Sequence, residues 1–193
     1  MSREVNTPVV SPFYMALSRL LAFPQPAMKE SLAEIEAAVR NEPALGEGSR
    51  RAGLDFMAWL RSQDLLDLQE IYTQTFDLTA EHTLCILHHL MEEQDRAKGG
   101  AMAGLIAFYR KNGVEYIAPE LPDYLPAILE CAAILAAEDA HDFLAQSEEA
   151  VVILRDRLRR HESHYLPIFE MLCDHLSQLK SAGIAAECEE CMP

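Results

Sequence analysis

Hydrophobic residues recur along most of the chain at spacings of three and four, which place them on one face of an α-helix. The clearest case follows Asp64, a candidate N-cap, where the apolar positions are Leu65, Leu68, Tyr72 and Phe76. No segment shows a convincing alternation of apolar and polar residues, the pattern of a half-buried strand. The chain is therefore predicted to be all-α.

Capping residues, prolines and glycines divide this pattern into about eight helices. Ser11 followed by Pro12 is typical of a helix start, and Gly113 stands where a helix ends in a left-handed residue. The predicted helices cover approximately residues 11–24, 26–40, 49–61, 64–76, 94–112, 123–137, 139–162 and 163–180. Residues 83–91 form a further short apolar stretch that we expect to be buried.

The helix at residues 94–112 has a face of small and apolar residues. This face contains Ala101, Leu105 and Phe108, together with Gly100 and Gly104 one helical turn apart. Because glycine has no side chain, another segment of backbone can approach it closely. We expect this pair of glycines to pack against a neighbouring part of the fold.

A length of 193 residues, half of them hydrophobic, suits one domain with one core. The sequence contains no internal repeat and no linker long enough to separate two domains. We therefore predict a single helical bundle at residues 11–180, preceded by an N-terminal extension at residues 1–10. Residues 181–193 lack a repeating apolar face and are predicted to form a disordered tail.

The chain is strongly acidic, with 16 Lys and Arg against 31 Asp and Glu and a formal net charge of −15. This charge opposes binding to nucleic acid and to anionic lipid headgroups. Two interpretations stay open, namely simple solubility and attraction of a cationic partner. We find neither a signal peptide nor a run near the ~20 apolar residues that span a bilayer. Because five irregularly spaced cysteines fit a reducing compartment, we expect a cytoplasmic protein.

Enzyme chemistry has little support in the sequence. The candidate metal ligands are Glu138, His141, His82, Cys85, His88 and His89. Glu138 and His141 match half of a di-iron site, but the sequence has no second Glu-x-x-His pair to complete it. The other four lie in an otherwise apolar segment, and no second cluster of ligands is evident. Cys188 and Cys191 have a metal or redox spacing without a partner pair. We predict neither a catalytic centre, a metal nor a cofactor, and we keep a metal-dependent helical enzyme as the alternative.

Acidic residues border the apolar face of the helix at 64–76. Asp67, Glu70, Gln74 and Asp77 form a stripe, and Asp123 and Glu130 share a face of a later helix. The stripe is either an ordinary solvated surface or the rim of a groove that attracts Lys and Arg. Asp123 has a second interpretation, as the N-cap of its own helix.

Two segments resemble a known family. Residues 71–77 read Ile-Tyr-Thr-Gln-Thr-Phe-Asp, and residues 120–130 read Glu-Leu-Pro-Asp-Tyr-Leu-Pro-Ala-Ile-Leu-Glu. They resemble the Tyr-x-x-x-Phe-Asp and Leu-Pro-Asp-x-Leu-Pro-x-x-Leu-Glu signatures of the nitrate reductase delta-subunit family, the NarJ branch of the redox-enzyme maturation chaperones. The resemblance spans about residues 11–180 and implies an all-helical bundle.

The resemblance also implies a function and a site. Members of this family bind the N-terminal segment of the catalytic subunit of a molybdenum oxidoreductase, usually respiratory nitrate reductase, and hold the apoprotein until the molybdenum cofactor is inserted. The candidate peptide-binding residues carried over from the two signatures are Tyr72, Phe76, Asp77, Leu121, Pro122, Asp123, Tyr124, Pro126 and Glu130. Residues 79–82 lack the arginines that relatives often carry, so a dimethyl sulfoxide, selenate or chlorate reductase stays open as the client. A permanent structural subunit is a third alternative.

These observations combine into one hypothesis about binding. A basic amphipathic helix from the client docks in an apolar groove, because such helices attach through apolar side chains at i, i+3 or i+4 and i+7. Tyr72 and Phe76 are predicted to form the walls of the groove. Asp77, Asp123 and Glu130 are predicted to supply the negative charge at its rim.

Overall fold

The computed structural model describes residues 10–92 and 96–190, with side chains through residue 180. Within these ranges the chain forms eleven α-helices and no strand, which confirms the all-α prediction. The helices are α1 (Pro12–Leu21), α2 (Pro26–Glu30), α3 (Leu32–Asn41), α4 (Glu47–Ser62), α5 (Leu65–Tyr72), α6 (Leu87–Leu90), α7 (Arg96–Lys111), α8 (Leu125–Ala133), α9 (Ala137–Ala145), α10 (Glu148–Arg160) and α11 (Leu166–Glu190). A π-helical turn, η1 (Thr73–Asp77), and a 3-10 turn, η2 (Ala80–His82), connect α5 to α6.

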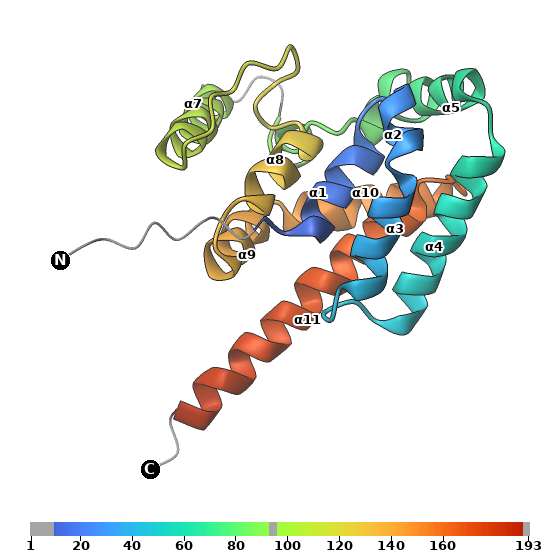
Figure 1. The fold of residues 1–193 in the computed structure, drawn as a ribbon. Coiled ribbons are helices and arrows are strands. Elements are labelled where there is room, and N and C mark those ends of the chain that lie inside the picture. The colour runs from blue at the N-terminus through green and yellow to red at the C-terminus, as the bar shows by residue number, and fades with distance from the viewer. Residues whose placement is uncertain (1–9, 93–95, 191–193) are drawn as a thin grey trace.

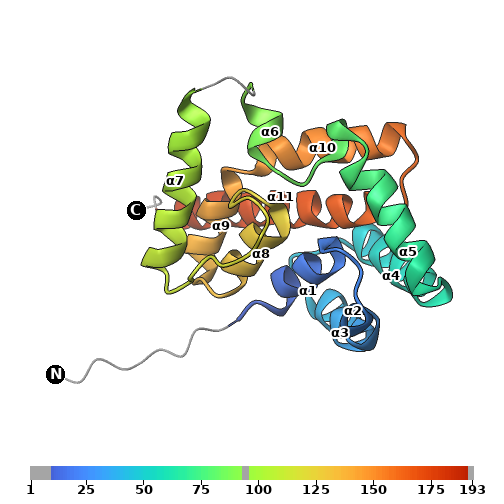
Figure 2. The same ribbon diagram turned by 90° about the horizontal axis from the view of Figure 1, so that it is seen from above.

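The helices pack around α11, the longest of them (Figure 1). Helices α10 and α4 lie against α11, while α1 packs between α3 and α8. Helix α7 stands at the edge of the bundle beside α8 and α9, and both views show it apart from the central helices (Figures 1 and 2). Of its side chains only Tyr109 is buried.

The sequence locates several helix ends correctly. The Ser11 hydroxyl accepts a hydrogen bond from the Tyr14 amide at 3.4 Å, which makes Ser11 the N-cap of α1 as predicted. Gly113 follows α7 with a φ of 80°, the left-handed conformation expected for a residue that ends a helix. These local signals hold because they depend on near neighbours in the chain.

Two predicted helices are broken in the structure. The one at residues 26–40 is interrupted at Ser31, and the one at residues 139–162 divides into α9 and α10 at Gln146 and Ser147. Ser147 precedes two glutamates, a typical helix start that the continuous apolar pattern conceals. The break lets α9 pack against α8 while α10 lies along α11.

The C-terminal helix is longer than the sequence predicts. The apolar pattern predicts an end near residue 180, whereas α11 continues to Glu190. The added segment is rich in alanine and glutamate, which favour helix. The predicted extension at residues 1–10 lies outside the described residues except for Val10, as does Cys191.

Candidate functional site

The two signature segments meet in the folded chain. The Tyr72 and Tyr124 hydroxyls lie 2.8 Å apart, and the Tyr72 hydroxyl is also 3.0 Å from the Leu21 carbonyl oxygen. The Tyr72 hydroxyl therefore donates to Leu21 and accepts from Tyr124. Because burial raises the pKa of the Tyr124 phenol to about 12, both groups keep their protons at neutral pH. The first segment is thus tied to α1 and to the second segment.

The aromatic residues of the first segment belong to the core. Tyr72 is 3% exposed and Phe76 is 4% exposed, and the Phe76 ring packs edge-on against Tyr165 at 4.8 Å between centroids. The prediction that Tyr72 and Phe76 form the walls of a groove does not fit this burial. Their spacing turns both rings toward the bundle interior, where they pack against each other at 4.9 Å between centroids. Asp77, at the end of η1, is exposed.

Asp123 holds the second segment to the start of α6 and to the residue before it. It is 0% exposed, its Oδ2 atom accepts a hydrogen bond from the Leu87 amide at 2.9 Å, and its carbonyl oxygen accepts one from the Ile86 amide at 3.0 Å. The Leu125 amide donates to the Leu84 carbonyl oxygen at 2.8 Å. Asp123 is therefore not the N-cap of its own helix, a position that Tyr124 occupies.

The other residues of the second segment lie in different surroundings. The Pro126 carbonyl oxygen is buried and accepts from the Ser18 hydroxyl at 2.8 Å, and the Pro122 carbonyl oxygen accepts from the Tyr109 hydroxyl at 2.7 Å. Leu121 is 51% exposed and Glu130 is exposed. The predicted residues thus do not form one surface, and several of them hold the bundle together.

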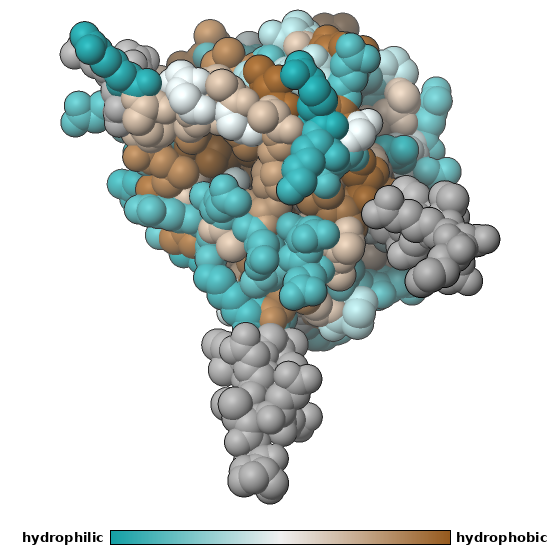
Figure 3. Space-filling model, turned by 90° about the vertical axis from the view of Figure 1, so that its left-hand side faces the viewer, coloured by the Kyte–Doolittle hydropathy of each residue, from teal (hydrophilic) through white to brown (hydrophobic). Residues whose placement is uncertain are grey.

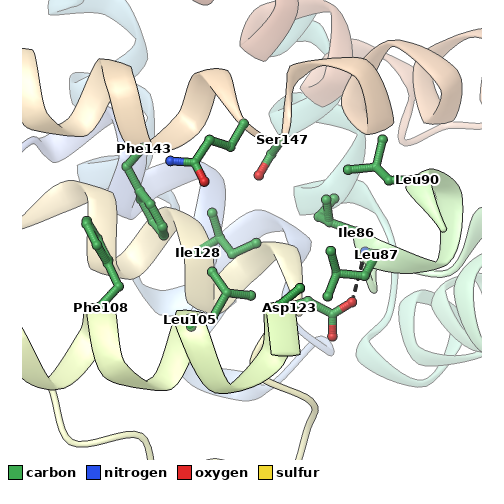
Figure 4. A pocket seen from close by; sticks show the side chains of 12 residues that line it. Ile86, Leu87, Leu90, Leu105, Phe108, Asp123, Ile128, Phe143 and Ser147 are labelled. Atoms are coloured by element: carbon green, nitrogen blue, oxygen red, sulfur yellow. Dashed lines mark hydrogen bonds between the residues drawn. The ribbon is translucent and has the colours of Figure 1, made fainter. Parts of the chain in front are cut away.

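A cavity of about 400 Å³ lies beneath α7, between it and α6, α8 and α9 (Figure 4). Its size falls in the range of binding pockets, roughly 300–1,000 Å³. It is lined by Ile86, Leu87, Leu90, Ala101, Gly104, Leu105, Phe108, Asp123, Ile128, Phe143, Gln146 and Ser147. On the surface, a brown hydrophobic hollow opens below the pale band of α7 (Figure 3). The cavity is mostly apolar, with Asp123 and two other polar residues at its edge.

Asp123 is the one predicted site residue that lines this cavity. Its Oδ2 atom is taken by Leu87, while its Oδ1 atom is buried without a hydrogen-bond partner among the described residues. Buried polar atoms are usually hydrogen-bonded, so an unpaired carboxylate oxygen calls for an explanation. Burial, with the nearby charge of Asp123, also raises the pKa of the Cys85 thiol. Asp123 thus places a buried carboxyl group beside an apolar cavity.

Helix α7 is attached mainly through its C-terminal half. The Phe108 ring stacks on Phe143 at 4.4 Å and 11°, and Tyr109 is buried. At Gly100 and Gly104, by contrast, an added Cβ atom would meet nothing within 4 Å. The prediction that these glycines pack closely against the rest of the fold is therefore wrong. Gly104 instead borders the open cavity.

The sequence did not identify the cavity because its lining comes from four separate helices. One signal was present, the small and apolar face at Ala101, Gly104, Leu105 and Phe108. From the sequence, this face predicts packing within the fold. Its helix is only partly covered, however, so the same pattern marks a surface.

The histidines before α7 have structural roles. His89 Nε2 lies 2.8 Å from the Thr83 carbonyl oxygen, and His89 Nδ1 lies 2.9 Å from the Arg157 guanidinium, so both ring nitrogens are engaged. His82 Nδ1 lies 3.1 Å from the Thr75 carbonyl oxygen. Burial lowers the pKa of both rings and keeps them neutral. Within residues 10–92 and 96–180, no group of three or more His, Cys, Asp or Glu side chains is arranged to hold a metal ion.

No helix in the described part of the chain is long and apolar enough to cross a membrane. Residues 25–171 match the protein family described as nitrate reductase delta subunit. The chain is 33% identical over 159 residues to the nitrate reductase molybdenum cofactor assembly chaperone NarJ of Escherichia coli strain K12. This match covers 81% of the chain and 66% of that relative, so the chain spans slightly less than two thirds of its length.

Two further relatives carry similar names. A probable nitrate reductase molybdenum cofactor assembly chaperone, NarW of Escherichia coli strain K12, is 32% identical over 69% of the chain and 55% of its own length. A probable chaperone of the same description, NarJ of Bacillus subtilis strain 168, is 28% identical over 91% of the chain and 92% of its own length. The similarity to the Bacillus protein therefore extends over nearly the whole of both chains.

Proposed function

Because the chain belongs to the nitrate reductase delta subunit family, we propose that it is an assembly chaperone for a molybdenum oxidoreductase, specifically a respiratory nitrate reductase. The observation that carries this proposal is the match over residues 25–171, which includes both signature segments. The relatives are named as assembly chaperones rather than enzymes. In this proposal the chain binds the apo form of the catalytic subunit, supports insertion of the molybdenum cofactor and then leaves.

The cavity beneath α7 is the proposed site for the N-terminal segment of the client. Its lining of leucine, isoleucine and phenylalanine side chains suits the apolar face of an amphipathic helix. Tyr72, Phe76, Tyr124 and Pro126 support this site from within the core, where they fix α1, α5 and α8 relative to one another. Their proposed role is to maintain the shape of the cavity, while the residues that line the cavity contact the client.

Asp123 gives the site its charge preference. A carboxylate at the edge of an apolar cavity attracts a Lys or Arg of the client more strongly than it would in water. The net charge of −15 acts in the same direction at longer range and speeds the encounter with a basic peptide. A chaperone must also release its client, and a micromolar dissociation constant, about −8 kcal/mol, permits this.

The proposal is tested by mixing the purified chain with the apo catalytic subunit of a respiratory nitrate reductase and with a version that lacks its N-terminal segment. We expect a stable complex with the complete apoprotein, no complex with the truncated one, and release once the molybdenum cofactor is bound. A chain that stays bound to the mature enzyme would instead be a structural subunit. Equal binding to both forms would exclude the N-terminal mode.

The identity of the client is tested with peptides alone. N-terminal peptides from nitrate, dimethyl sulfoxide, selenate and chlorate reductase catalytic subunits are titrated into the chain by calorimetry. We expect the nitrate reductase peptide to bind at least tenfold more tightly than the others. A peptide with its basic residues replaced by glutamine should bind more weakly and with less dependence on salt. Unchanged affinity and salt dependence for the neutral peptide would show that charge has no role.

A further inference from the structure

Helix α6 is held at its two ends by different contacts. At its start, the Leu87 amide donates to the Asp123 carboxylate at 2.9 Å. Its four residues are only half-buried, and a helix this short is not stable by itself. Near its end, the His89 ring contacts α10, on which α6 packs (Figure 2). The position of the C-terminal end of α6 therefore depends on what His89 binds.

Both nitrogens of the His89 ring have partners that fix its protonation state. Nε2 lies 2.8 Å from the Thr83 carbonyl oxygen, which only accepts, so Nε2 carries the proton. Nδ1 lies 2.9 Å from Nη1 of Arg157, which only donates, so Nδ1 is an unprotonated acceptor. His89 is therefore neutral. A second proton, on Nδ1, would turn the hydrogen bond into a contact between two positively charged donors.

Arg157 joins three elements through one guanidinium group. The same Nη1 atom donates to the Glu81 carbonyl oxygen of η2 at 2.9 Å, so Arg157 holds both η2 and α6 on α10. Leu90, next to His89, lines the cavity beneath α7 and packs on the core. The Arg157–His89 bond thus positions one part of the cavity wall.

The surroundings of His89 disfavour its charged form. Burial lowers the pKa of His89 below its ordinary value, and positive charge on neighbouring side chains lowers it further, while the hydrogen bond to the Thr83 carbonyl oxygen acts in the opposite direction. These neighbours are Arg157 of α10, His88 of α6 and His82 of η2, whose ring packs against His161 at the end of α10. Because the folded state binds this proton less readily than the unfolded state, the Arg157–His89 bond is formed at neutral pH and is lost as the pH falls below about 6.5.

We propose that the Arg157–His89 hydrogen bond is a latch that opens when His89 takes up a second proton on Nδ1, and that its opening releases the C-terminal end of α6 from α10. Leu90 then leaves the cavity wall, while Asp123 still holds the start of the helix. Arg157 is the positioning residue of this latch, and His89 is its pH-sensitive part. The inference does not depend on the proposed function, because all of these contacts lie within the chain.

Two variants are designed to fix the latch in opposite states. In His89→Asn the amide oxygen can take the place of Nδ1 as the acceptor for Arg157, and the side chain does not titrate. In Arg157→Met the donor is lost, while an apolar side chain of similar length keeps the packing of the arginine stem. His88→Asn is the matched control, because it removes the neighbouring histidine of α6 and leaves both partners of the bond.

The experiment follows amide hydrogen exchange of the full chain by NMR. Rates are expressed as protection factors, so that the intrinsic effect of pH on exchange is removed. The Met91 amide donates to the Leu87 carbonyl oxygen and reports on the end of α6, and the Ile128 amide of α8 reports on the rest of the fold. Imidazole signals of His89 give its tautomer and its titration midpoint in the same samples.

We expect the protection of the Met91 amide in the unmodified chain to fall about tenfold between about pH 7.5 and about pH 5, with the midpoint of the His89 ring. Protection of the Ile128 amide should stay constant over this range. His88→Asn should behave like the unmodified chain. His89→Asn should keep its Met91 protection throughout, and Arg157→Met should have low Met91 protection at every pH.

Four results would overturn the inference. An equal loss of protection at Met91 and Ile128 would show general unfolding instead of a local opening. A loss that persists in His89→Asn would assign the pH dependence to another group. Met91 protection that Arg157→Met leaves unchanged would show that this bond does not hold α6. A proton on Nδ1 of His89 at neutral pH would show that the bond to Arg157 is not formed.

Discussion

Tyr72→Phe separates a structural role for the first signature segment from a role in binding. The substitution removes only a hydroxyl that bridges α5, α1 and the second segment, and it keeps the buried ring. The Leu21 carbonyl oxygen then loses its donor and the Tyr124 hydroxyl loses its acceptor. Leaving buried polar groups unpaired costs about 1–3 kcal/mol. We expect a loss of about 2 kcal/mol in the free energy of unfolding, or roughly 4–8 °C in Tm for a chain of this size.

The measurement combines urea unfolding with peptide titration. Tyr124→Phe serves as the partner variant, because Tyr72 keeps its bond to Leu21 there, and we expect a smaller loss of about 1 kcal/mol. The double variant should be less destabilised than the sum of the two, since both single changes break the same bond. Peptide affinity should stay within twofold for all three variants, measured at a temperature where each is folded.

The opposite pattern would refute this reasoning. If Tyr72→Phe weakened peptide binding tenfold and left the free energy of unfolding unchanged, the hydroxyl would contact the client. Exact additivity of the two losses would show that the Tyr72 and Tyr124 hydroxyls are not bonded to each other.

Further predictions concern stability. Burial lowers the pKa of His175 to about 4, so the unfolded chain takes up a proton first as the pH falls below about 6.5. The free energy of unfolding is therefore highest above pH 6.5 and falls toward pH 4, with a loss of about 2 kcal/mol at pH 5. Urea titrations at several pH values should show a free energy of unfolding that depends less on pH for His175→Gln than for the unmodified chain. Arg50 donates to four carbonyl oxygens at the end of α3 and in the next loop, at 2.7–2.9 Å. Urea unfolding of Arg50→Lys should show a loss of about 2 kcal/mol in the free energy of unfolding, because one ammonium group cannot reach all four carbonyl oxygens. An unchanged urea midpoint would contradict this. Glu162 has a φ of 49°, a backbone conformation that glycine adopts without strain from a side chain. Thermal melts of Glu162→Gly should therefore show a free energy of unfolding about 1 kcal/mol higher. A lower Tm would show that the turn is not strained.

The features that depend on near neighbours in the chain could be predicted from the sequence. The cap at Ser11 and the left-handed Gly113 are examples, and the apolar spacing around Tyr72 correctly indicated a helix. That same spacing also indicated burial. The resemblance to the family implies that Tyr72 and Phe76 take part in binding a client, whereas their burial favours a role in holding the core. A sequence motif alone does not distinguish residues that bind a partner from residues that hold the core together.

Tertiary features could not be predicted from the sequence. Asp123 bonds to the amide of Leu87, 36 residues earlier, and no local pattern indicates that pairing. The cavity forms because α6, α7, α8 and α9 each place apolar side chains around one space. The break at Ser147 is what turns α9 toward that space, and it was hidden within one long apolar pattern.

In the proposed function, a client peptide enters the cavity beneath α7. The most direct test is methyl NMR of the full chain during titration with the N-terminal peptide of the catalytic subunit. We expect the methyl signals of Leu87, Leu105 and Ile128, which line the cavity, to shift with the added peptide. Shifts confined to the exposed Leu66 and Leu78 beside the first signature segment, with the cavity signals unmoved, would contradict it.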